Sequence, residues 1–289
     1  MKKISSSPVF GLAAAVLAAG ALAGSVVGPR PATALPPPDE LVSHRAIYEL
    51  TLAQTRGNSS AVAARGRILY DFSGSVCEGY ALQFRQVSEL DNGEGKVTLS
   101  DLRATTWEEG AAKKFIFKSQ NYLNETMIDS VDGEAERQSD KVAVTLVKPG
   151  DKTFNLEAAM VFPTDHMRRI IAAARAEKNI LELPIYDGSD KGEKIYNTLT
   201  VIGPAIAPNE RVPTDAAAGK EALSHLKRWP VTVSYFDKAA TPGDQAPIYS
   251  IKFELYENGI SRALVLDYND FAISGELTSL EIRNSKPCN

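Results

Sequence analysis

The sequence is poor in the residues that most often carry out chemistry, since its 289 residues include 2 cysteines and 3 histidines. The cysteines, Cys77 and Cys288, lie 211 positions apart, which excludes a CxxC redox motif. So few thiols also argue against a zinc site. The histidines, His44, His166 and His225, include no pair at HxxH or HxxxH spacing, and no HExxH occurs. We therefore expect no metal ion.

Other catalytic and cofactor-binding motifs are missing as well. The sequence has no GxSxG elbow, no P-loop and no dinucleotide fingerprint. The 36 acidic residues leave a glycosidase-like carboxylate pair open, but no particular pair stands out. The net charge is −4 without a basic block, which argues against nucleic-acid binding. We expect a protein that is not an enzyme and needs no cofactor.

Residues 1–34 have the pattern of a secretory signal peptide. Lys2 and Lys3 precede an apolar run from Phe10 to Val27, and Ala32-Thr33-Ala34 is a small-x-small cleavage site. A single membrane anchor is the alternative, but the run is rich in weakly hydrophobic Ala and Gly. Cleavage near Ala34 would remove three basic residues and change the net charge from −4 to −7. We expect an exported protein.

Export places the two cysteines in an oxidising compartment, where a disulfide is the default for an even count. A bond between Cys77 and Cys288 would tie the end of the chain to an early strand. The chain-entropy treatment gives about 5 kcal/mol for a loop of this length. Two free thiols or an intermolecular pair are the alternatives.

Short strands dominate the chain after a Pro-rich leader at residues 35–40. Alternating patterns and turn residues predict strands at Ser43–Gln54, Arg65–Phe72, Cys77–Leu90, Lys96–Glu109, Lys113–Leu123, Lys141–Val147, Phe154–Phe162, Ile180–Tyr186, Lys194–Ile202, Val231–Asp237, Ile248–Tyr256, Arg262–Asn269 and Phe271–Arg283. Turns are predicted at 73–75 and 131–133, the second followed by a further strand. The expected fold is all-β and mainly antiparallel. It is one domain over residues 41–289, a large sheet curled into a spiral, barrel or half-barrel.

One segment changes its period from two to that of a helix. Residues His166 to Lys178 carry apolar side chains at helical spacing, and Pro163 precedes them. Thr164 or Asp165 is the expected N-cap. A second short helix is expected between Asp215 and Lys227.

The aromatic residues of the N-terminal strands are the best candidates for a binding surface. They are Tyr48, Tyr80, Phe84, Trp107, Phe115 and Phe117. Most of them fall on one face of their strands, so they form either a core inside a closed sheet or the lining of an open groove. In both cases the helix that begins near His166 could plug the interior. Tyr and Trp combine apolar area with a polar group, which suits an amphipathic guest.

Three runs and the terminal cysteine resemble a known family. They are LVSHRAIYEL at residues 41–50, YDFSGSVCEGY at 70–80, LDYNDF at 266–271, and Cys288. Together they resemble the envelope integrity protein B (EipB) family of periplasmic proteins, over essentially the whole mature chain. Asn269 departs from the family pattern, which has Gly there. The resemblance implies a β-spiral, a disulfide from Cys77 to Cys288, a periplasmic location and a role in envelope integrity.

The resemblance implies no enzymatic activity, so we expect a binding protein. Its concave face would hold an extended peptide, a lipoprotein segment or a lipid, and other periplasmic envelope proteins are possible partners. The alternatives are a structural protein that docks without a ligand and an envelope hydrolase. His44, Arg45 and His166 are further candidate site residues, although His44 at a strand start and His166 in a first helical turn also suit backbone hydrogen bonding. The oligomeric state stays open.

Overall fold

The computed structural model describes residues 40–57, 61–208, 210–217, 220–238, 246–284 and 288. The expected signal peptide and nearly all of the leader lie outside these residues, which belong to one compact unit. In the described part of the chain, fourteen strands form a single sheet in which neighbouring strands are antiparallel. The prediction of an all-β antiparallel fold is confirmed.

The strands are β1 (His44–Thr55), β2 (Ala63–Ser75), β3 (Gly79–Asp91), β4 (Val97–Glu108), β5 (Lys114–Leu123), β6 (Thr126–Arg137), β7 (Lys141–Lys148), β8 (Lys152–Glu157), β9 (Ile180–Ile185), β10 (Tyr196–Ile202), β11 (Arg228–Asp237), β12 (Tyr249–Tyr256), β13 (Ser261–Asp267) and β14 (Phe271–Ile282). The helices are α1 (Pro163–Arg175), α2 (Glu221–Ser224) and the short 3-10 helix η1 (Asp190–Gly192). The second helix is thus a single turn within the predicted 215–227 segment.

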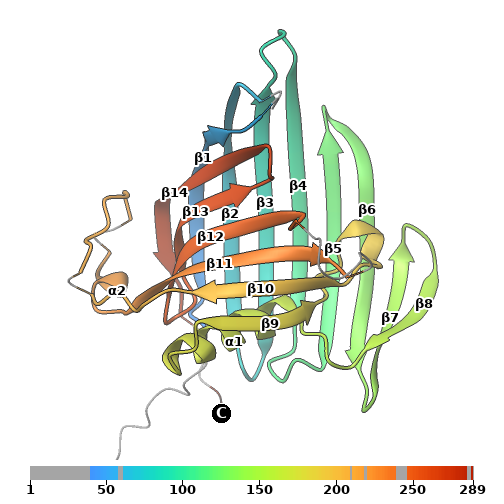
Figure 1. The fold of residues 1–289 in the computed structure, drawn as a ribbon. Helices are drawn as coiled ribbons and strands as arrows, with labels where there is room; N and C mark the ends of the chain where they lie inside the picture. The colour runs from blue at the N-terminus through green and yellow to red at the C-terminus, as the bar shows by residue number, and fades with distance from the viewer. Residues whose placement is uncertain are drawn as a thin grey trace, which may run out of the picture. The chain divides into compact units, whose positions relative to one another are not determined.

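The order of strands in the sheet explains how the fold closes. It runs from β8 down to β1, then from β14 down to β9, so the first and last strands pair at the centre. The two edge strands, β8 and β9, are neighbours in the chain and are connected through α1. Figure 1 shows the sheet curled so that β10–β13 cross in front of β2–β4.

The two edges of the sheet meet at a single bridge. Val161, which follows β8, donates its N–H to the carbonyl of Pro184 at 2.8 Å, and its own carbonyl accepts the N–H of Tyr186 at 3.0 Å. Because α1 begins directly afterwards, this contact fixes the point at which the helix enters the interior of the curled sheet. The curled sheet is therefore nearly closed into a barrel.

Helix α1 begins three residues earlier than predicted, and its predicted cap is wrong. Phe162 is the N-cap residue and Pro163 lies in the first turn, where its missing N–H costs nothing. Thr164 and Asp165 are therefore inside the first turn, with N–H groups that need an acceptor. The Glu108 carboxylate at the end of β4 accepts both, at 2.7 and 2.8 Å.

Two predicted turns are also wrong. Strand β2 continues to Ser75, so the turn lies at residues 76–78 and contains Cys77. Strand β6 continues through residues 131–133, with a shift in its register to β7 between Asp132 and Gly133, and the turn before it is formed by residues 124 and 125, both with positive φ. Gly133 lies within this strand, at a position that favours glycine because a Cβ there would be 2.9 Å from the Phe117 ring. The glycine is thus a packing residue and not a turn residue.

Asn269, at the position where a glycine is expected from the resemblance, forms a turn that tolerates its side chain. Its φ is 71°, in the left-handed region that Asn tolerates better than most residues. Its side-chain amide donates to the carbonyls of Pro247 at 3.0 Å and Ile248 at 3.2 Å. These bonds hold the β13–β14 turn against the residues that precede β12.

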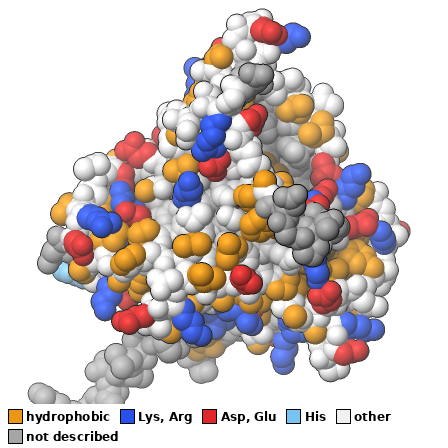
Figure 2. Space-filling view, in the orientation of Figure 1, with side chains coloured by type: hydrophobic (Ala, Val, Ile, Leu, Met, Phe, Trp, Pro, Cys, Tyr) orange, Lys and Arg blue, Asp and Glu red, His pale blue; other side chains and the backbone are white. Residues whose placement is uncertain are grey.

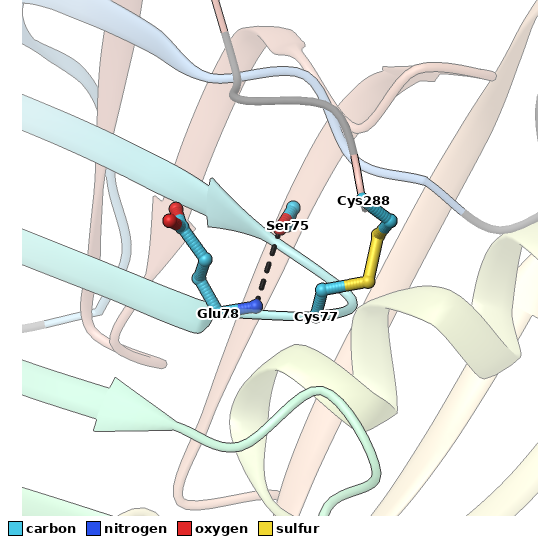
Figure 3. The surroundings of a disulfide bond; sticks show 4 residues. All are labelled: Ser75, Cys77, Glu78 and Cys288. Atoms are coloured by element: carbon cyan, nitrogen blue, oxygen red, sulfur yellow. Dashed lines mark hydrogen bonds between the residues drawn. A yellow bond between two sulfur atoms is a disulfide. The ribbon is translucent and has the colours of Figure 1, made fainter.

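The two cysteines form the disulfide, with their Cα atoms 5.8 Å apart. Cys77 lies in the turn between β2 and β3, where the Glu78 N–H donates to Ser75 Oγ at 3.3 Å (Figure 3). The bond therefore attaches the end of the chain, after β14, to a turn two strands beyond β14 in the sheet. The prediction of an intramolecular bond is confirmed.

We expect the disulfide to stabilise the fold chiefly by restricting the unfolded chain. Replacing both cysteines (Cys77→Ser with Cys288→Ser) should lower the free energy of unfolding in urea by up to about 5 kcal/mol. Reduction of the wild-type protein should have the same effect. Alkylation of both thiols in the native, unreduced protein would contradict this prediction.

Gly188 offers a second test of packing, because it combines a φ of +73° with close contact. A Cβ at Gly188 would lie 2.3 Å from Cδ2 of Phe117. Gly188→Ala should therefore lower the free energy of unfolding by about 2–4 kcal/mol, through backbone strain and overpacking together. Gly57→Ala is the control: its φ is +55°, but nothing lies within 4 Å. Equal losses from the two variants would show that the contact with Phe117 is unimportant.

Candidate functional site

The interior of the curled sheet is incompletely filled and holds a cavity of about 530 Å³. This volume falls within the range of about 300–1,000 Å³ that is typical of small-molecule sites. The lining residues come from three groups of elements, namely β1–β4, β11–β13 and α1, with a few from the connecting segments. Most of the lining side chains are apolar or aromatic.

The first wall consists of alternate residues on three adjacent strands. They are Ile68, Tyr70 and Phe72 on β2, Leu82, Phe84 and Gln86 on β3, and Leu102 and Thr106 on β4. The register places Tyr70 opposite Phe84 and Phe72 opposite Leu82. Because side chains alternate between the faces of a strand, this two-residue spacing directs all of them to the same side.

The second wall faces the first from β11–β13. It contains Val233 and Tyr235 on β11, Tyr249, Ile251 and Phe253 on β12, and Leu264 and Leu266 on β13. Tyr235 and Tyr249 are direct cross-strand neighbours, and their rings stack with centroids 4.4 Å apart. Burial raises the pKa of both tyrosines, so their hydroxyl groups stay protonated.

Helix α1 lies against the cavity with Met167 and Ile170, and its first turn contributes Pro163, Thr164 and His166. The position of this first turn depends on Glu108, whose side chain is almost fully buried. Burial raises the pKa of Glu108 to about 7, while the N–H groups of Thr164 and Asp165 act in the opposite direction. The cap is therefore a carboxyl group that titrates near neutral pH.

The two buried histidines in the lining are uncharged. His166 places Nε2 3.4 Å from the Thr198 hydroxyl, and burial, with a smaller effect of Arg169, lowers its pKa to about 4. His44 has Nδ1 2.8 Å from the carbonyl of Val42, and its ring stacks on Tyr70 at 5.6 Å. Burial also lowers the pKa of His44. Neither imidazole carries a positive charge near neutral pH.

Asp187, which follows β9, is the acidic residue of the lining. Its carboxylate accepts the N–H of Ser189 at 2.9 Å. Burial raises the pKa of Asp187, and hydrogen bonds from Ser189 oppose this effect. The same segment continues into η1, where Gly188 and Gly192 pack against apolar side chains of β5–β7.

The residues singled out from the sequence fall into separate groups. Tyr48, Phe84, His44 and His166 line the cavity. Tyr80, Phe115 and Phe117 belong to the packed core, the first beside α1 and the other two in a cluster with Phe162 and Tyr186.

The remaining two candidates lie outside the cavity. Trp107 donates its indole N–H to the carbonyl of Glu78 at 3.3 Å, close to the disulfide turn. Arg45 points away from the interior, with Nε 4.0 Å from Asp71. Both positions are those of surface residues that stabilise neighbouring strands.

Several lining residues were not anticipated, above all the second wall with Tyr235 and Tyr249. Alternation in residues 231–237 and 248–256 did indicate strands, but not which face turns inward or what lies opposite. The sequence also gives no sign that Glu108 caps α1, because no local pattern connects a glutamate at the end of a strand with a helix that begins 55 residues later. These roles depend on contacts between distant segments.

Within the described residues, no group of three or more His, Cys, Asp or Glu residues could hold a metal ion. A search of the same residues for a helix long and apolar enough to cross a membrane also finds none. The cavity can therefore be described from its own side chains as a mainly apolar space with hydroxyl, imidazole and amide groups and one carboxyl group in its lining.

The fold and the cavity define a class of protein: a barrel-like antiparallel β-sheet that encloses an apolar interior. The chain matches the family model described as EipB-like over residues 37–284. The cell envelope integrity protein EipB of Brucella abortus (strain 2308) is 36% identical over 242 residues, which are 84% of each chain. The chain therefore belongs to the EipB-like family, a family of cell envelope proteins, as the sequence resemblance implied.

A solved structure agrees with this assignment. The crystal structure of a beta-barrel-like protein of the domain of unknown function DUF1849 from Brucella abortus matches with a TM-score of 0.79 and 36% sequence identity. The match covers 84% of this chain and 99% of that chain. The curled, barrel-like architecture is thus shared with a relative whose structure has been determined.

Because the pKa of Glu108 is raised in the folded protein, Glu108 should make the free energy of unfolding fall as the pH rises. Between the ordinary carboxyl pKa of 4.5 and about 7, the folded protein keeps a proton that the unfolded chain has lost. The stability that Glu108 contributes is therefore fully present below about pH 4.5 and is lost as the pH rises through 7. The difference in unfolding free energy, wild type minus Glu108→Gln, should fall by about 2–3 kcal/mol from pH 5 to pH 8.

Taking the difference between the two proteins removes the contribution of His166, which has the opposite sign because its lowered pKa favours the folded state at higher pH. Denaturant unfolding at several pH values measures the difference directly. A difference that stays constant or rises with pH would contradict the buried, protonated state of Glu108.

Proposed function

We propose that this protein is a non-enzymatic periplasmic protein that supports envelope integrity by holding an apolar chain in its interior cavity. The guest is the acyl chain of a lipid or of a lipoprotein segment. The observation that carries the proposal is the cavity of about 530 Å³ between two aromatic and aliphatic walls. A preformed space of this kind gains free energy by removing an apolar guest from water.

The origin of the walls favours an acyl chain over an extended peptide. A peptide that binds as an added strand needs a sheet edge with unpaired N–H and C=O groups. Strands β2–β4 and β11–β13 each pair with a neighbour on both sides, so their backbone groups are already used. The cavity offers a guest mainly side chains, which suits a hydrocarbon chain.

Three observations support the periplasmic location. The N-terminal 34 residues have the pattern of a cleavable export signal. The described cysteines form a disulfide, which persists in oxidising compartments. The relative from Brucella abortus bears the name of a cell envelope integrity protein, which refers to the cell envelope and to no reaction.

The state of the reactive side chains supports a non-enzymatic role. Both cysteines are consumed by the disulfide. His44 contacts the backbone carbonyl of Val42, and the Thr198 hydroxyl beside His166 donates to the carbonyl of Leu183 at 2.8 Å instead of to the imidazole. Their principal contribution to the cavity is to provide polar groups in an otherwise apolar lining.

Filling the cavity tests the proposal. Leu82→Trp adds volume on the cavity side of β3, and it should weaken binding of the uncharged fluorescent probe N-phenyl-1-naphthylamine at least tenfold, because the probe and the indole compete for one space. Leu69→Trp is the matched control, since Leu69 lies on β2 but is absent from the cavity lining. Fluorescence titration gives both affinities, and native mass spectrometry of the wild-type protein should detect a co-purified lipid.

The two variants have distinct outcomes. Strong binding by Leu69→Trp and weak binding by Leu82→Trp places the guest in the cavity. Equal binding by both variants would place the probe elsewhere and contradict the proposal. Wild-type protein that neither carries lipid nor binds the probe would favour a docking role on the outer surface.

A further inference from the structure

We infer that the cavity discriminates by charge: it accepts an apolar chain whose enclosed head group is uncharged and forms hydrogen bonds, and it rejects a carboxylate or another anion. This inference rests on the proposed function and specifies the class of guest. It comes from the distribution of charged side chains between the lining and the exterior, together with the polar groups that remain in the lining.

The lining contrasts with the outside of the molecule. Figure 2 shows Lys and Arg side chains interspersed with Asp and Glu over the visible face. Among the 27 described residues that line the cavity there is neither a Lys nor an Arg, and the acidic residue there is Asp187. An anion that entered the cavity would find no opposite charge and would add to the negative charge of this carboxyl group when it is ionised.

Basic residues near the cavity are committed to other partners. Arg168, next to Met167 on α1, donates from one terminal guanidinium nitrogen to the carbonyl of Gly110 at 2.8 Å, while its buried Nε has no hydrogen-bond partner among the described residues. Arg262, next to Ser261 in sequence, pairs with Asp215 and Glu254. Moving either guanidinium into the cavity would break a buried polar contact, so neither is available to an anionic guest without loss.

The remaining sources of positive potential are also occupied or absent. The N-terminus of α1 lies at the cavity, but the Glu108 carboxylate already accepts the N–H groups of Thr164 and Asp165. The two buried histidines are uncharged, because burial lowers the pKa of each. An anionic head would therefore lose its hydration without gaining a charge partner.

An uncharged head, in contrast, has partners in the lining. The Tyr70 hydroxyl belongs to the lining, and its ring stacks on the rings of His44 and Phe72. Gln86 and Thr106 add an amide and a hydroxyl group on the same wall. A hydroxyl, ester or amide group on the guest can both donate to and accept from such groups.

Matched amphipaths test the inference without any mutation. Dodecan-1-ol and dodecanoate have chains of the same length and differ in head charge at pH 7.5. We expect dodecan-1-ol to displace N-phenyl-1-naphthylamine from the wild-type protein at concentrations at least tenfold lower than dodecanoate. A ratio below tenfold, or a preference for dodecanoate, would overturn the inference while leaving the apolar cavity as the binding site.

A charge placed in the cavity should reverse the selectivity. Gln86→Lys introduces a cation into the lining, and it should improve displacement by dodecanoate at least tenfold relative to wild type. Gln83→Lys is the matched control, because Gln83 lies on the same strand but is exposed and absent from the lining. A folded Gln86→Lys protein, checked by circular dichroism, with unchanged affinity for dodecanoate would overturn the inference.

The results also separate this inference from the proposed function. If neither the probe nor dodecan-1-ol binds to the wild-type protein, the proposed function fails. If both amphipaths bind in the cavity with equal affinity, as shown by loss of binding in Leu82→Trp, the proposed function holds and the charge selectivity fails. If dodecan-1-ol alone binds strongly, both stand.

Discussion

The antiparallel pairing of β1 with β14 is the contact on which the rest of the structure depends. It joins two meanders, one from each half of the chain, into a single sheet with the first and last strands at its centre. As a result the two edges, β8 and β9, are consecutive in sequence and can be brought together by one helix and one bridge. The disulfide stabilises the same junction, because it ties Cys288, which follows β14 in the chain, to the turn between β2 and β3.

Closing the sheet in this way buries polar groups, and the protein satisfies them with specific partners. Glu108 caps α1 from the opposite wall, which anchors the helix in the interior. Arg228, which is 1% exposed, bonds to Glu254 at 2.7 Å and to the carbonyl of Arg211, and so holds the segment that precedes β11 onto the sheet. Each contact joins distant parts of the chain, so the arrangement of the helix and loops depends on directional bonds as well as on apolar packing.

The cavity follows from the same architecture. Aromatic side chains fill the space between β5–β7 and the segment after β9, whereas the space between β2–β4 and β11–β13 keeps a volume of about 530 Å³. The walls of this space are apolar, and its polar groups are mostly uncharged at neutral pH. A protein of the cell envelope with such an interior is suited to hold a lipid chain that would otherwise face water.

Local sequence patterns predicted most of the strands, the main helix and the class of fold. Alternation of side chains, turn residues and one helical period are local properties, and they predicted the antiparallel sheet and the α1 segment. The residues at 41–50 and 70–80 and the two cysteines indicated the family and the disulfide. The first of these runs contains His44 and Tyr48, two candidate site residues that line the cavity.

Which aromatic residues face the cavity and which belong to the core depends on contacts between distant segments, which local patterns do not contain. Phe84 and Phe117 have the same local pattern, yet the first meets an open space and the second meets the ring of Tyr186 at 5.6 Å. The sequence likewise did not predict that Glu108 caps α1, or that Tyr70 faces the strands of the second wall. In each case the physical reason is that alternation specifies a face of a strand, while the partner across that face is set by how the sheet curls.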